Sequence, residues 1–230
     1  MAWKLFMHAV TMLIRNWREV VQIFLVPMVI VIVLIGLFFS GRGGFGMMLL
    51  IFLAVMLVFI WPIVSWHRFV LQEEPVTSYF PTFRLDRIAA YLLQGLLIGL
   101  IAAFPSALVI FVNARLSTWL DPAVMLFLQT GLFLLPSWIL TRLSVTLPSV
   151  ALGKKDLSLA KVWRATSDFG PIFGLTLIVS GIQLLNELVA LALGGAAGVV
   201  WSIVVGVLFA LVNISLLTTL YGHYVEKRPI

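Results

Sequence analysis

Four polar side chains lie inside two otherwise apolar runs near the C-terminal end of the sequence. They are Gln183, Asn186, Glu187 and Asn213. Polar and ionisable groups at membrane depth are costly, and they commonly mark ion or substrate sites. Gln183 lies one helical turn before Glu187, so the two would share a face of a helix. These four residues form the candidate intramembrane polar site.

Glu187 has two interpretations. It lies six residues before Leu193, the outer end of its apolar run, so it could be a carboxylate near the interface that hydrogen-bonds to a neighbouring helix. It could instead bind a proton or a cation. A single carboxylate without a buried cation or a second carboxylate makes a poor proton relay, which favours the first interpretation. Asn213 falls deeper from the outer side, and we expect it to bond between helices rather than to lie level with Glu187.

Residue patterns that indicate catalysis are missing from the sequence. His8, His67 and His223 stand outside any H-E-x-x-H pattern, so we predict no metal site. The chain has no cysteine, and no serine falls in G-x-S-x-G. The glycine-rich segment 41–46 neither follows a strand nor precedes a Walker lysine. We therefore expect no catalytic residue, no cofactor and no enzymatic activity.

Composition places the chain in a membrane. Hydrophobic residues make up 62% of the 230 residues and charged residues only 10%, whereas soluble domains average about 25% charged residues. The net charge of +6 could suggest nucleic acid. However, the cations lie at the ends of apolar runs and form no basic domain, so anionic lipid headgroups are the expected partners and nucleic acid is not.

The apolar runs predict an all-α, polytopic helix bundle that forms a single transmembrane domain over residues 1–230. About 20 apolar residues span the hydrocarbon core. The six expected spans are residues 20–39, 47–65, 88–112, 123–141, 171–193 and 199–221. Amphipathic interfacial segments are expected at 1–18, 69–87 and 142–168, the second as a loop with a short helix and the third as helical pieces split near Gly153.

Basic residues predict the orientation. With six spans, thirteen Lys and Arg fall on the side that holds both termini, and only Arg42 and Arg115 fall on the other. The positive-inside rule then places both termini in the cytoplasm. The candidate contacts with anionic lipids or a partner are Lys4, Arg15, Arg18, Lys154, Lys155, Lys161 and Arg164.

A threefold pattern of a polar segment followed by a hairpin divides the chain at 1–65, 66–141 and 142–224. It could be a parallel internal repeat. The favoured interpretation is that it reflects the aromatic and basic anchors that any span acquires where it reaches the cytoplasmic interface.

Three stretches carry a resemblance to known proteins: SWHRFVLQEEP at 65–75, RLSVTLPSVALG with LAKVWRAT between 142 and 166, and TTLYGHYVEKRP at 218–229. With these, the chain resembles uncharacterised six-span inner-membrane proteins of proteobacteria. More distantly, it is similar to the membrane domain of some glycerophosphodiester phosphodiesterases. The resemblance implies a location in the bacterial cytoplasmic membrane. It brings no catalytic residues, because the phosphodiesterase domain itself is not in this sequence.

The sequence leaves two functions open, of which it favours the first. The first is a non-enzymatic accessory protein of the inner membrane that packs against a membrane-protein partner, a second copy of itself or lipids. The alternative is a small transporter, channel or lipid-handling protein that uses a site near Glu187. The alternative requires a polar cavity that reaches the membrane midplane, whereas a dry interior filled by Leu and Phe would count against it.

Overall fold

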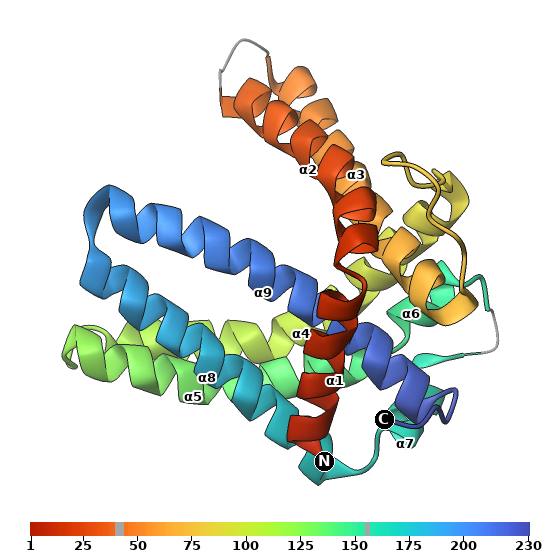
Figure 1. Ribbon diagram of the computed structural model, residues 1–230. Coiled ribbons are helices and arrows are strands. Elements are labelled where there is room, and N and C mark those ends of the chain that lie inside the picture. The colour runs from red at the N-terminus through yellow and green to blue at the C-terminus, as the bar shows by residue number, and fades with distance from the viewer. Residues whose placement is uncertain (40–43, 155–156) are drawn as a thin grey trace. The chain divides into compact units, whose positions relative to one another are not determined.

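The computed structural model describes residues 1–39, 44–154 and 157–230, and all regular structure in that part of the chain is helical. Figure 1 shows its helices in chain order. They are α1 (Ala2–Arg15), α2 (Trp17–Phe39), α3 (Phe45–Gln72), α4 (Leu85–Leu116), α5 (Pro122–Ser144), α6 (Leu147–Ala151), α7 (Leu159–Ala165), α8 (Phe169–Leu193) and α9 (Gly195–Tyr224).

Six helices, α2 to α5, α8 and α9, are long and apolar enough to cross a membrane. This confirms the predicted all-α, multi-pass architecture. The helices extend beyond the apolar runs, and α3, for example, continues to Gln72. Pro27, Pro62, Pro105 and Pro136 each lie inside a continuous helix. Proline is tolerated there because other groups can satisfy the backbone that it frees.

The shorter helices fall in two of the three segments predicted to be interfacial, and their place in the membrane interface stays a prediction. α1 occupies the first, and α6 and α7 are the two helical pieces of the third, separated around Gly153 with its φ of 78°. The second segment differs from the prediction, because residues 73–84 contain no helix. Pro75 and Pro81 lack the N–H that a helix needs and disfavour helical backbone in the residue before them.

The described helices gather in two compact units. Unit 1 comprises Met1–Val10, Leu97–Val145 and Leu159–Ile230, and unit 2 comprises Thr11–Leu96 and Thr146–Ser158. We term the inner end of each span the end that the basic residues predict to be cytoplasmic. It is the N-terminal end of α2, α4 and α8 and the C-terminal end of α3, α5 and α9.

In unit 1, α8 packs between α5 and α9, as Figure 1 shows. Most of the buried side chains on these three helices lie near their inner ends. The start of α1 packs there too, because Leu5 and Ala9 are fully buried and the Ser215 hydroxyl donates to the Ala9 carbonyl oxygen at 3.0 Å. The broader apolar face of α1, with Trp3 60% exposed, has no such cover. That face remains available to lipid.

In unit 2, α2 and α3 form an antiparallel hairpin whose buried residues also lie near the inner ends. The Phe24 and Trp66 rings approach there, with centroids 6.4 Å apart. Towards the outer end the hairpin has no buried core, because no residue in 28–39 or 44–59 is buried. Large apolar side chains along this part face away from the unit and require lipid or another apolar surface.

The connection between α8 and α9 is tight. Gly194 and Gly195 have φ values of 62° and 47°, which favour glycine. A Cβ atom on Gly198 would lie 2.4 Å from the carbonyl oxygen of Ala190. The small residues at 194–198 therefore allow the backbones of the last two helices to approach closely.

We predict that Gly198→Ala destabilises the α8–α9 hairpin by roughly 1–3 kcal/mol, the range for overpacking a close contact. The added methyl group meets backbone, which cannot rotate away as a side chain can. Gly206→Ala on the same helix is the control, because nothing lies within 4 Å of its Cβ position. Unfolding of both variants in mixed micelles measures the difference. Equal stability of the two would contradict the tight connection.

Candidate functional site

A cavity of about 310 Å³ in unit 1 lies between α5 and α8, with Phe209 of α9 at its wall. Its polar lining residues are Gln129, Thr130, Ser137 and Thr141 of α5, and Thr176, Ser180, Gln183 and Glu187 of α8. We term it the central cavity. Its volume falls within the range of about 300–1,000 Å³ typical of small-molecule sites.

Helical spacing explains why these side chains meet. Residues three and four apart lie on one helix face, so each of the two helices presents a polar stripe. Because α5 and α8 are antiparallel, the stripes run in opposite directions: Thr130 and Glu187 line the central cavity, and Thr141 and Thr176 line both it and the next cavity. The stripe on α5 covers twelve residues from Thr130 to Thr141, and the eleven helical steps between them span about 16 Å. This exceeds half of the roughly 30 Å hydrocarbon thickness.

The threonine hydroxyls donate to their own helices. Thr130 donates to Leu126 O at 2.9 Å, Thr141 to Ser137 O at 2.8 Å, and Thr176 to Ile172 O at 3.0 Å. This i to i−4 bond is a common way to satisfy a hydroxyl inside a helix. It uses the proton and leaves the oxygen lone pairs as acceptors. The cavity wall is consequently rich in hydrogen-bond acceptors.

Two of the four polar residues singled out from the sequence line the central cavity. Gln183 donates from Nε2 to Glu187 Oε1 at 3.1 Å within α8. Asn213 lines a different cavity and donates to Phe209 O at 2.8 Å in its own helix, rather than to a neighbouring one. Asn186 does not line the central cavity, and its buried Oδ1 has no hydrogen-bond partner in the part of the chain that the structure describes.

Two further cavities adjoin the central one along α5. An outer cavity of about 620 Å³ between α4 and α5 shares Gln129 and Phe133 with it. An inner cavity of about 250 Å³, which includes Asn213, shares Thr141, Thr176 and Val179. The lining of the row begins at Pro122 and ends at Ser144, the two ends of α5. The α5 residues are not among the candidate residues that the sequence indicated, although their helical spacing is a signal that could identify them.

The inner end of unit 1 holds a buried guanidinium. Arg142 is 5% exposed and stacks on Trp163, with Cζ 3.6 Å from the ring centroid, while Trp138 lies 4.9 Å away. It donates to Trp163 O and, at 3.2 Å, to Thr166 Oγ1. Arg142 therefore fastens α7 to α5 and is withdrawn from the lipid headgroups.

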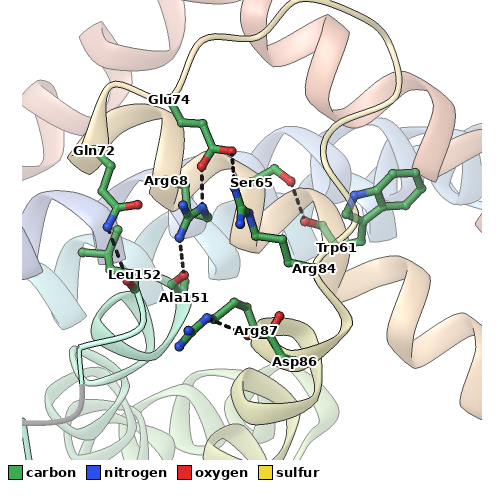
Figure 2. A network of polar contacts seen from close by, with 10 residues as sticks. All are labelled: Trp61, Ser65, Arg68, Gln72, Glu74, Arg84, Asp86, Arg87, Ala151 and Leu152. Carbon is green, nitrogen blue, oxygen red and sulfur yellow. Dashed lines mark hydrogen bonds and ion pairs between the residues drawn. The ribbon is translucent and has the colours of Figure 1, made fainter.

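A polar network at the inner end of unit 2 joins three segments (Figure 2). Glu74 accepts from Arg68 Nε at 2.5 Å and from Arg84 at 3.0 Å, which ties both ends of the 73–84 loop to α3. Arg68 also donates to Ala151 O, and Gln72 donates to Leu152 O, each at 3.3 Å. The sequence predicts a loop here, as part of the segment 69–87. It did not indicate the bonds to α6.

Those last two bonds satisfy the C-terminal carbonyls of α6, which a helix end leaves unpaired. Backbone bonds from Gly153 N to Val150 O and from Lys154 N to Ser149 O close the same helix end. Together with the φ of 78° at Gly153 they form a Schellman motif. Five residues are too few for a helix stable by itself, so α3 holds α6 in place.

Six of the seven basic residues predicted to contact lipid or a partner have exposed side chains: Lys4, Arg15, Arg18, Lys154, Lys161 and Arg164. Lys155, the seventh, lies outside the described residues, as does Arg42 of the charge count. Exposure is compatible with headgroup contact. Whether these cations touch lipid stays a prediction.

A histidine–tyrosine pair lies buried in unit 2. His67 and Tyr91 have stacked rings, and His67 Nε2 lies 3.2 Å from the Tyr91 hydroxyl. The described residues contain no group of three or more His, Asp or Glu side chains placed to hold a metal ion. The pair links α3 to α4.

We predict that Glu74→Gln destabilises the protein near neutral pH, on the order of 1 kcal/mol for a partly exposed ion pair. Burial raises the pKa of the Glu74 carboxyl, but hydrogen bonds from Arg84 and Arg68 and their charges lower it by more, so the pKa lies below its ordinary value of 4.5. The folded state therefore binds this proton less tightly than the unfolded state. Its stabilisation is complete above pH 4.5 and is lost as the pH falls through the lowered value.

Melting curves of wild type and Glu74→Gln between pH 7 and pH 3 measure this effect. The gap between the two should be widest at pH 7 and should close below pH 4.5. Glu73→Gln, at a neighbouring exposed carboxyl, is the control and should follow wild type. A gap that stays constant with pH would show that the carboxylate charge of Glu74 does not matter.

We predict that Arg142→Lys costs about 1–3 kcal/mol and releases α7, because lysine can neither stack as a plane nor donate in a fork. Arg164→Lys on α7 changes an exposed guanidinium and is the matched control. Limited proteolysis between residues 157 and 168 measures the release. Equal protection in both variants would contradict the role given to Arg142.

Comparisons with known proteins leave function to be inferred from this geometry. The chain matches no protein-family model, no curated protein and no solved structure.

Proposed function

We propose that the chain is a small transporter or lipid-handling protein that holds or moves a small polar or amphiphilic molecule along α5. This is the alternative that the sequence left open near Glu187. We favour it over an accessory role because transport requires a polar cavity at membrane depth, and the central cavity supports that requirement.

The observation that carries the proposal is the row of three adjoining cavities along the whole length of α5. A helix of 23 residues is about 34 Å long, comparable to the hydrocarbon core. Polar groups that face hydrocarbon are costly unless they bond to something. A polar ligand or water in the row would satisfy the acceptors of α5 and α8.

The proposal is for a non-enzymatic protein of the bacterial cytoplasmic membrane with both termini inside. The thirteen cations on the predicted inner side support this orientation. The exposed cations on α1, around Gly153 and on α7 would then lie against anionic headgroups.

The accessory role is a second candidate. It is favoured by the outer part of the α2–α3 hairpin, where residues 28–39 and 44–59 include none that is buried. A partner helix or a second copy of the chain could cover this surface, and lipid could do the same. Pull-down of a stable stoichiometric partner from the native membrane would support this role.

The proposal predicts water in the central cavity, which single cysteines can detect because the chain has none of its own. Only the thiolate reacts, and it forms where water is present. In sealed membranes, Ser137→Cys should react with a charged, impermeant methanethiosulfonate at least about tenfold faster than Leu135→Cys. Ser137 lines the central cavity, and Leu135, two residues away, is 57% exposed on the surface of the unit.

The two positions differ in depth by only about 3 Å, so depth cannot explain a difference in rate. Ser180→Cys and Leu177→Cys repeat the comparison on α8, where Leu177 is 45% exposed. Slow reaction at both serines would mean that the cavity is dry, and it would remove the support for transport.

A further inference from the structure

We propose that the ligand of the central cavity carries an ammonium group, with Glu187 as its counter-charge. This inference deepens the proposed function and rests on it. It names the chemical class of the ligand: a protonated primary amine on a short apolar body.

Charge is the first reason. Glu187 is the single charged residue that lines the central cavity. It makes no ion pair with any other residue that the structure describes. Its hydrogen bond from Gln183 satisfies one oxygen without cancelling the charge. A carboxylate at membrane depth usually pairs with an opposite charge, and a cationic ligand would supply one.

Hydrogen-bonding capacity is the second reason. The hydroxyl protons of Thr130, Thr141 and Thr176 are used within their own helices. Their lone pairs, together with the carboxylate, make a wall of acceptors. An ammonium group offers three donors and no acceptor, so it matches this wall. A carboxylate or phosphate ligand would be repelled by Glu187, the one charged residue that lines the cavity.

The apolar part of the wall is the third reason. Phe133 and Phe209 line the cavity beside Val179 and Leu184. Phenyl rings attract a cation over their faces within about 6 Å. They also accommodate an alkyl chain. A short alkylamine therefore finds a counter-charge, acceptors and apolar surface in one cavity.

The test is calorimetric titration of the protein in nanodiscs, with empty discs subtracted. The probes are octylammonium, octanol and octanoate, which share one chain and differ in the head group. A primary alkylamine, like the lysine side chain, is protonated at pH 7. Octylammonium should bind at least about tenfold more tightly than the other two. Glu187→Gln should abolish that preference, Glu187→Asp should keep most of it, and Glu73→Gln should leave it unchanged.

The outcomes separate the inference from the function on which it rests. Loss of the preference in Glu187→Gln alone supports an amine site. Equal binding of all three probes, weakened by the cavity-filling variant Ser180→Phe but not by Glu187→Gln, overturns the amine ligand and leaves a ligand cavity in place. Binding of no probe above empty discs, together with unreactive Ser137→Cys, overturns both.

Discussion

Hydrocarbon offers no hydrogen bonds, and this constraint governs the arrangement of polar groups along α5 and α8. The threonines of both stripes meet it by donating to carbonyls of their own helices. A hydroxyl satisfied in this way still has lone pairs, and helix geometry directs them to the face that the stripe occupies. Two such stripes in antiparallel contact produce a wall of acceptors without any charged donor. Glu187 lies at one end of this wall, and its carboxylate makes the net charge of the cavity lining negative.

The inner ends obey a different constraint, because water and headgroups are close and the chain must reverse direction there. Each unit is fastened near the inner ends of its own helices by a guanidinium. Arg142 stacks on Trp163 in unit 1, and Arg68 joins Glu74 to the end of α6 in unit 2. Arginine suits both positions because its planar fork can donate to several oxygens while its faces stack. The short helices α6 and α7 persist because these side chains hold their ends.

Individual residues show which features of the fold and of the candidate site could be predicted from the sequence. Runs of about 20 apolar residues define the spans without reference to tertiary structure, and Glu187 stands out because a carboxylate in such a run is rare. Thr130 and Ser137 did not stand out, because single hydroxyls are ordinary in membrane helices and gain meaning only once α5 is known to face α8. The bond from Arg68 to Ala151 joins residues 83 positions apart, so no local pattern could indicate it. Arg142 was counted among the cations of the inner surface, since the positive-inside rule does not distinguish buried from exposed cations.

The distribution of buried residues limits how the central cavity could open. Segments with few buried contacts have low local stability, and those of unit 1 lie mainly towards the outer ends of α5 and α8. The α8–α9 pair is an exception at its outer turn, because Gly198 brings the two backbones into contact. The outer ends of α8 and α9 are therefore tied to each other. α5 is held at its inner end by Arg142. A ligand that entered the central cavity from the outer side, as the proposed function requires, would pass between the outer half of α5 and α8, the helix that carries Glu187.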